Sequence, residues 1–188
     1  AIDLGQRGVR CILLEQKDAP QFIPKMERCN ARTMEIYRRI GIAQKIRDAG
    51  FPSDVPMDVF IVTSLTEPPL LHLPYPSVKQ AQAEIAACQD GSMPLEPYQL
   101  ISQYTLEPLL KSVAEGLPSV DVRYGHEFVS FTQGPGGVRA RVKTADGASA
   151  ELTAQYLVGC DGGSSVVRRQ LGIKLQGEAN LLQLRKAL

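Results

Sequence analysis

Residues 156–168 read YLVGCDGGSSVVR and combine three local patterns in a short space. The apolar run 156–160 is typical of a buried strand, and the Asp-Gly-Gly sequence after it predicts a turn. Residues 165–171 then predict a helix that Gly172 ends. A strand, a tight turn and a helix in this order are the building units of an α/β fold.

The turn is the first candidate for a binding site. Gly162 and Gly163 have no side chains, so a ligand can approach their backbone closely, and the helix that follows points N–H donors toward a phosphate or an oxygen. Asp161 can accept hydrogen bonds from sugar hydroxyls. The alternative is a purely structural turn in which Asp161 caps the helix.

The sequence before this motif predicts an antiparallel meander. Turn sequences at 134–137 and 145–147 separate strand-like runs, and the alternation in VRARVKT places Val138, Ala140 and Val142 on one face. The strand-like runs are 120–124, 128–133, 138–144 and 148–154.

The first residues of the chain predict half of a βαβ unit. Residues 1–7 read as the end of a helix followed by Gly8, and residues 9–15, VRCILLE, read as a strand buried on both faces of a parallel sheet. Glu15 lies at the carboxyl end of that strand. In dinucleotide-binding units an acid there binds the ribose hydroxyls about 20 residues after a Gly-rich turn, which is expected about five or more residues before Ala1. A solvated glutamate at a strand end is the alternative.

A basic segment near residue 30 is a second candidate. Arg28 precedes a helix predicted over 31–40, with Asn30 as its N-cap and Gly41 as its end. Arginines just before a helix can bind a diphosphate through paired hydrogen bonds. Solvated charges around a helix start are the alternative. A second helix is predicted over 42–49.

Gln103 begins an amphipathic helix predicted over 102–115, where it can both donate to and accept from a cofactor. On its own it would be an ordinary polar residue. Pro108 lies inside this helix and predicts a kink or an earlier end.

The composition changes between residues 52 and 97. The runs 57–63 and 70–75 predict strands, while residues 76–97 are rich in Gln, Ala and Pro and predict an irregular or partly helical insertion. We expect this part of the chain to leave the domain formed by its neighbours.

The charge balance excludes some partners. Lys and Arg number 21 against 20 Asp and Glu, a net charge of +1, so no basic stripe is expected for nucleic acid or a membrane surface. No apolar run is long enough for a membrane-spanning helix.

Cysteine and histidine give no sign of a metal site. The cysteines are Cys11, Cys29, Cys88 and Cys160. Because none belongs to a C-x-x-C pair, a zinc site is not predicted, and their spread fits a reducing cytoplasm. Cys11, in an apolar run, is expected to be a buried free thiol. His72 and His126 are isolated from any nucleophile, so neither a triad nor a metal role is predicted.

Four segments together resemble a known family. Their order is the one found in FAD-dependent aromatic hydroxylases of the p-hydroxybenzoate hydroxylase type. The segments are LLEQKDAP, MERCNARTMEIYRRIGI, LISQYTLEPLL and YLVGCDGGSSVVRRQLGI. The chain is most similar to the phenol and hydroxyphenylpropionate hydroxylase branch. The resemblance covers most of residues 1–174, is weakest over 52–97, and is most specific in the C-D-G-x-x-S-x-V-R string at 160–168. It implies an α/β fold: a Rossmann-like FAD-binding domain with an antiparallel meander and part of a β-sheet substrate domain.

The resemblance also implies which residues hold the cofactor. Glu15 matches the acid that holds the adenosine ribose, Arg28 the arginine near the flavin and diphosphate, and Gln103 a glutamine that touches the cofactor. Asp161 and Gly162 match a motif associated with both FAD and the reduced nicotinamide.

Arg168 matches the terminal arginine of that motif.

Members of the family use NAD(P)H to reduce FAD and place one oxygen atom of O2 on a phenol ring. Because the flavin carries this chemistry, no catalytic side chain and no metal ligand is predicted. The implied function is a flavoprotein monooxygenase that hydroxylates a phenolic or other aromatic substrate.

The implied domain division has four parts. These are an FAD-binding part at 1–51, substrate-domain strands and an insertion at 52–97, a second FAD-binding part at 98–174, and the start of a return to the substrate domain at 175–188. Phe60 and Tyr75 are candidates for packing near an apolar substrate pocket. The alternative for residues 52–97 is a surface excursion that does not contact the substrate.

The Gly-rich turn and the family's later Gly-Asp motif are absent from residues 1–188. We therefore expect an incomplete enzyme chain that alone holds FAD poorly and is inactive. One alternative is a flavin enzyme of the same fold with other chemistry, such as a halogenase or a reductase, although the absence of tryptophan disfavours a halogenase. Another is a remnant that binds no flavin. The protein is expected in the cytoplasm. Whether it forms a homo-oligomer is not predicted from the sequence.

Overall fold

The computed structural model describes residues 1–178, so most of the segment expected to return to a substrate domain, at 179–188, lies outside the described residues. The chain divides into two units. The first comprises Ala1–Val9 and Gln21–Ser119, and the second comprises Arg10–Pro20 and Val120–Leu188. The four-part division expected from the family resemblance stays a prediction.

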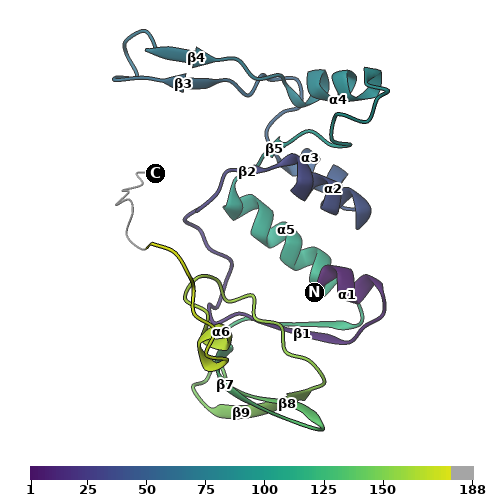
Figure 1. Cartoon of the computed structure of the whole chain (residues 1–188), viewed down its shortest axis with the longest axis vertical. Coiled ribbons are helices and arrows are strands. Elements are labelled where there is room, and N and C mark those ends of the chain that lie inside the picture. Colours follow the sequence, from purple (N-terminus) through teal and green to yellow (C-terminus); the bar gives the residue numbers. More distant parts are fainter. Residues whose placement is uncertain (179–188) are drawn as a thin grey trace. The chain divides into compact units, whose positions relative to one another are not determined.

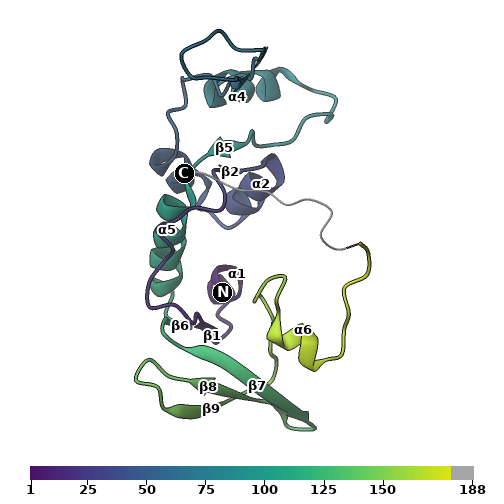
Figure 2. The same cartoon turned by 90° about the vertical axis from the view of Figure 1, so that its left-hand side faces the viewer.

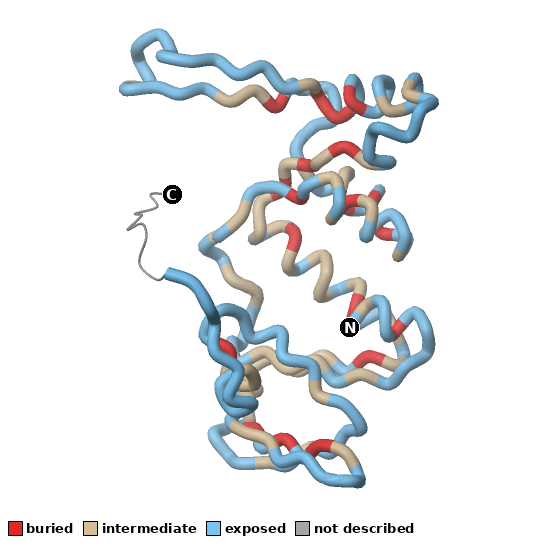
Figure 3. The backbone as a smooth tube through the Cα atoms, in the orientation of Figure 1, coloured by how far each residue is buried: buried red, intermediate tan, exposed pale blue. Residues whose placement is uncertain are grey.

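A small helical core organises the first unit (Figure 1). The first unit contains helices α1 (Ile2–Gln6), α2 (Ala31–Arg39), α3 (Ala43–Ala49), α4 (Val78–Ala87) and α5 (Gln103–Glu115), and the core lies among α1, α2, α3 and α5. Met34 on α2 and Ile46 on α3 are fully buried, and Leu106 on α5 packs in the same cluster. The buried positions along these helices are marked in Figure 3. Helix α5 continues through Pro108 and does not end early.

Glycines end two of these helices as the sequence predicts. After α1, Gly8 N–H donates to Gly5 O and Val9 N–H donates to Leu4 O, both at 3.0 Å. After α2, Gly41 makes the corresponding turn, and both glycines have a positive φ, 73° and 76°. This pair of hydrogen bonds is the Schellman motif, which requires a left-handed residue and so favours glycine.

Short strands connect the helices to an excursion of the chain. β2 (Arg28–Cys29) pairs with β5 (Gln99–Leu100), and β3 (Val59–Ile61) pairs with β4 (Leu71–Leu73), both antiparallel. The two strands predicted over 57–63 and 70–75 therefore exist and pair, although they are shorter than predicted.

The region predicted as irregular or partly helical contains helix α4. Ser77 Oγ accepts from Gln80 N–H at 3.2 Å, and the Gln80 side chain accepts from Ser77 N–H at 2.9 Å. This reciprocal capping box satisfies two donors at the start of the helix. Val78 and Ala81 are its buried residues.

Within residues 1–178, the second unit contains two sheets and one helix. β1 (Cys11–Leu14) pairs in parallel with β6 (Val120–Arg123). The meander, side by side in Figure 2, consists of β7 (Glu127–Gly134), β8 (Gly137–Lys143) and β9 (Ser149–Ala154). Val138, Ala140 and Val142 are buried on one face of β8, as predicted. α6 (Val166–Gln170) packs on β7, where Gln170 Oε1 accepts from Phe131 N–H at 3.1 Å.

Three local predictions are wrong. Residues 156–160 form no strand, and Tyr156 and Val158 are 84% and 72% exposed, because no described strand lies beside them to complete a ladder. β1 is not buried on both faces: Ile12 is 44% exposed, and β6 is its only partner among residues 1–178. Cys11, on the same strand, is free but only half-buried.

Within residues 1–178, no helix combines the length and apolar character needed to cross a membrane.

Candidate cofactor-binding site

The Asp161 carboxylate is bonded to the start of α6. Its Oδ1 accepts from the Ser165 hydroxyl at 2.5 Å, and its Oδ2 accepts from the N–H groups of Val166 and Val167 at 2.6 and 3.2 Å. These bonds, above all the one from Ser165, lower the pKa of Asp161. A carboxylate has about four lone-pair sites, so Oδ1 can accept one further hydrogen bond, for example from a hydroxyl of a ligand.

The expectation that α6 points free N–H donors at a ligand is wrong. Asp161 takes the first two donors, and Ser165 Oγ accepts from Arg168 N–H at 2.9 Å. Ser165 is the N-cap residue, and Asp161 supports it from four residues earlier. Because these side chains already satisfy the first turn, the capacity for binding lies in the turn before the helix.

That turn is open. Gly162 has a φ of 74°, a conformation that favours glycine, and no heavy atom lies within 4 Å of the place where a Cβ would stand at Gly162 or Gly163. Arg168 braces the turn: its Nη2 donates to Gly163 O at 3.0 Å and its Nη1 to Ile173 O at 2.9 Å. The guanidinium carries five N–H donors, so this bracing leaves some available.

Gly159 is a site residue that the sequence analysis missed. A Cβ there would stand 2.9 Å from Val167 Cβ, closer than real Cβ atoms come, and a tight 3.2 Å from Asp161 Oδ1. The extended segment therefore passes α6 at a distance that only glycine permits. The available signal was the glycine two residues before Asp161 in the quoted motif.

Glu15 follows β1 directly and is half-buried. Its N–H donates to Arg123 O and its carbonyl accepts from His126 N–H, both at 2.9 Å. Its Oε1 accepts from Lys17 N–H at 2.9 Å. The parallel ladder thus continues through Glu15 and fixes the backbone from which its carboxylate projects, as the ribose-binding hypothesis requires.

Arg28 and Gln103 lie on neighbouring segments of the first unit. Arg28 is opposite Leu100 in the β2–β5 pair, and its side chain is 54% exposed, with Glu27 Oε1 3.9 Å from Nη2. Asn30 caps α2 by accepting from Thr33 N–H at 2.8 Å. Asn30 is therefore structural, as predicted for the N-cap, while the Arg28 guanidinium is open to a ligand.

The Gln103 side chain holds the segment that leads to Arg28. Gln103 N–H donates to Met26 O at 3.1 Å, and its Oε1 accepts from Lys25 N–H at 2.6 Å. Its Nε2 donates to Glu107, whose other oxygen accepts from Gln21 N–H at 2.9 Å. Glu107 was not predicted as part of the site. No sequence motif marks it, and its role comes from the fold alone.

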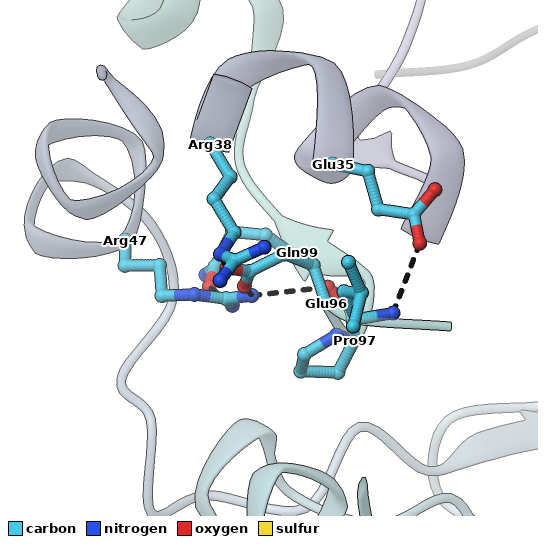
Figure 4. Close-up of polar contacts among 7 residues, drawn as sticks. Glu35, Arg38, Arg47, Glu96, Pro97 and Gln99 are labelled. Atoms are coloured by element: carbon cyan, nitrogen blue, oxygen red, sulfur yellow. Dashed lines mark hydrogen bonds and ion pairs between the residues drawn. The ribbon is translucent and has the colours of Figure 1, made fainter. Parts of the chain in front are cut away.

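A second polar group was also missed. Arg47, Glu96 and Gln99 form a largely buried network that links α3 to the start of β5 (Figure 4). The Arg38 side chain is 56% exposed, and its Nε atom lies 3.6 Å from Glu96 Oε1.

The histidines have local roles. His72 Nε2 is 2.7 Å from Asp58 Oδ2, and the His126 Nδ1 atom is 2.8 Å from Tyr124 O. Across residues 1–178, no three His, Cys, Asp or Glu side chains are grouped so that they could hold a metal ion.

The predicted residues divide between the two units. Arg28 and Gln103 belong to the first unit, whereas Glu15, the Asp161–Gly162 turn and Arg168 belong to the second. In the second unit, an acid at the end of a parallel strand and a glycine turn without obstructing atoms suit sugar hydroxyls. In the first unit, the exposed Arg28 suits a phosphate. Each unit therefore offers groups of the kind that bind a nucleotide cofactor.

Comparison with known proteins names the family. The chain belongs to the FAD binding domain family, which matches residues 1–187. It is 33% identical to the FAD-dependent monooxygenase apdD of Emericella nidulans, over 94% of this chain and 29% of that protein. It is 31% identical to aklavinone 12-hydroxylase DnrF of Streptomyces peucetius, over 96% of this chain and 36% of that protein.

A solved structure shows the same fold. The flavin-dependent monooxygenase PieE, in complex with FAD and substrate, superposes with a TM-score of 0.79 at 27% identity, over 94% of this chain and 30% of that one. The chain therefore spans about a third of the length of the relatives it matches. The α/β fold of the p-hydroxybenzoate hydroxylase type, expected from the sequence, is confirmed.

Proposed function

We propose that the protein is a flavoprotein monooxygenase that uses FAD, NAD(P)H and O2 to hydroxylate an aromatic substrate. The observation that carries this proposal is the family match over residues 1–187, which includes the open Cys-Asp-Gly turn. The monooxygenase and hydroxylase names of the relatives, at about a third identity over nearly the whole chain, support it.

In this proposal the residues of the chain bind and orient. Glu15 accepts from the ribose hydroxyls, and Arg28 pairs with the diphosphate through its exposed guanidinium. Gln103 contacts the cofactor next to the segment that it holds. Asp161 Oδ1 accepts from a cofactor hydroxyl at the Gly162 turn. FAD, when bound, supplies the redox chemistry, so none of these side chains acts as an acid, base or nucleophile.

Arg168 has a supporting part in the proposal. Its guanidinium donates to Gly163 O and Ile173 O, and these hydrogen bonds stabilise the conformation of the turn in the absence of a ligand. A contact with the reduced nicotinamide would use the donors that this bracing leaves available.

The β3–β4 hairpin is the part of the chain that we assign to the substrate. Phe60 stacks on His72 with ring centroids 4.4 Å apart, and Tyr75 meets Tyr98 edge-on at 6.3 Å. Phe60 and Tyr75 remain 54% and 43% exposed, so both offer ring surface to an aromatic molecule.

The test uses the intact protein. A visible flavin spectrum, NAD(P)H oxidation stimulated by an aromatic compound, and transfer of isotopically labelled oxygen from O2 to the product are the expected results. A flavin-containing protein that oxidises NAD(P)H without transferring oxygen would favour a flavin enzyme of the same fold with other chemistry. A colourless protein that does not take up added FAD would overturn the proposal.

A further inference from the structure

Arg47 donates from one buried guanidinium to three acceptors (Figure 4). Nη1 donates to Gln99 Oε1 at 3.1 Å, and Nη2 donates to Glu96 Oε2 at 2.6 Å and to Pro97 O at 3.1 Å. The Arg47 side chain is only 7% exposed and that of Glu96 14%. Glu96 and Pro97 lie in the segment that precedes β5, and Gln99 is the first residue of β5.

Gln99 extends this network inward. It is fully buried, and its Nε2 donates to Phe51 O at 3.0 Å and to Leu100 O at 2.9 Å, so every polar atom of its side chain is in use. Gly50 leaves room for it, because a Cβ at residue 50 would stand 2.5 Å from Gln99 Nε2. The geometry of β5 is therefore fixed from the side of α3.

β5 in turn fixes the segment that carries Arg28. Gln99 pairs with Cys29, and Leu100 pairs with Arg28. The pairing continues beyond the strands, since Ile101 N–H donates to Glu27 O at 2.9 Å and Gln103 Oε1 accepts from Lys25 N–H at 2.6 Å. Residues 25–29 and 99–103 thus form one hydrogen-bonded ribbon that contains both candidate cofactor-binding residues of the first unit.

We propose that Arg47 is a positioning residue for the cofactor site, which fixes the ribbon of Arg28 and Gln103 through its bonds to Glu96, Pro97 and Gln99. This inference rests on the proposed function, because it requires that Arg28 and Gln103 contact FAD. A guanidinium is needed because its planar fork reaches several acceptors at once. A lysine can keep the ion pair with Glu96 but leaves the buried Gln99 Oε1 without its donor.

Arg38 provides a matched control. It approaches the same Glu96 carboxylate, but at the other oxygen and from an exposed position on α2. Exposed ion pairs of this kind contribute little to stability. Arg38→Lys and Arg47→Lys are therefore the same chemical change made on opposite sides of one carboxylate.

The experiment measures FAD binding by the intact protein in a double-mutant cycle. Arg47→Lys is expected to weaken FAD binding about tenfold or more and to change the shape of the bound flavin's visible spectrum, whereas Arg38→Lys stays within about twofold of the wild type. Adding Arg28→Ala should cost less in the Arg47→Lys background than in the wild type, because Arg47 acts through Arg28. Val142→Ala, which removes buried side-chain volume from the second unit, should show no such coupling to Arg28→Ala.

Each outcome of this cycle supports or rejects the positioning role of Arg47. Unchanged FAD affinity in Arg47→Lys, or losses that add without coupling to Arg28→Ala, would overturn the positioning role. If Arg47→Lys does not fold, Glu96→Gln, which keeps the shape of the acceptor and removes its charge, enters the same cycle under the same criteria. A wild-type protein that binds no FAD would reject the proposed function and this inference with it, whereas a wild type that binds FAD with no coupling rejects the inference alone.

Discussion

Replacing Glu15 with alanine should weaken FAD binding by the intact protein roughly 5- to 150-fold, the equivalent of about 1–3 kcal/mol. Glu15 Oε1 already accepts from Lys17 N–H at 2.9 Å, so the capacity left for a ligand is Oε2 and one lone pair of Oε1. That capacity matches two ribose hydroxyls. The backbone of Glu15 is held by Arg123 and His126, so truncating the side chain should not move the strand.

The assay is a titration of the FAD-free protein with FAD, followed by flavin fluorescence or calorimetry. Glu15→Gln keeps an acceptor for Lys17 N–H and can still bond a hydroxyl, so a smaller loss is expected. Glu151→Ala removes an exposed acid from β9 in the same unit and should leave the affinity unchanged. If Glu15→Ala binds FAD as tightly as Glu151→Ala does, the ribose assignment is wrong.

Three further predictions follow from local geometry. The hydroxyl of the α6 N-cap serine and two backbone N–H groups hold the pKa of Asp161 below its ordinary value of 3.8. This stabilises the fold above that value and is lost as the pH falls through the lowered pKa. Asp161→Asn should thus lower the free energy of unfolding at pH 7, and urea titrations should show the difference from the wild type shrinking below pH 3.8. Gly41→Ala should cost about 1–2 kcal/mol in urea unfolding because φ is 76°, whereas Gly116→Ala, at a φ of −72°, should cost nothing. Burial raises the pKa of the Cys29 thiol and Cys160 is exposed, so peptide mass spectrometry should find Cys160 alkylated in the folded protein and Cys29 only after unfolding.

Helix ends and the meander could be predicted from the sequence because their causes are local. Asn30 needs only Thr33, three residues away, and Gly41 needs only the last turn of α2. The alternation along β8 is likewise complete within seven residues. In each case the residue type and its near neighbours determine the free energy of the feature.

Features that depend on distant partners could not be predicted. The apolar run 156–160 has strand composition, but a strand also needs a neighbour to complete its hydrogen bonds. Arg47 meets Gln99 across 52 positions of sequence, and nothing near either residue indicates this pairing. Helix α4 lies in the stretch predicted as irregular or partly helical, but its bounds were not predicted, because its buried face is too narrow to produce a clear apolar period.

In the candidate site, too, the feature with a local cause could be predicted from the sequence and the rest could not. The motif around Asp161 marked the turn correctly as a place where backbone is open. Which donors remain free was not predictable, because the side chains of Asp161 and Ser165 can turn either to a ligand or to the helix. In the folded chain both turn to the helix.

The place where the chain leaves and re-enters the helical core has a consequence for how this protein can vary. Phe51 N–H donates to Leu100 O at 2.8 Å, and Gln99 Nε2 donates back to Phe51 O at 3.0 Å, so the two ends of the segment 52–98 are tied to each other. Because this junction is closed by its own hydrogen bonds, α2, α3 and α5 can keep their packing when the segment between changes. The entropy of closing a loop grows only slowly with its length. Insertions, deletions and exchanges should therefore accumulate in 52–94, whereas Glu96 and Pro97, which Arg47 holds, and the residues on either side of the junction tolerate few substitutions.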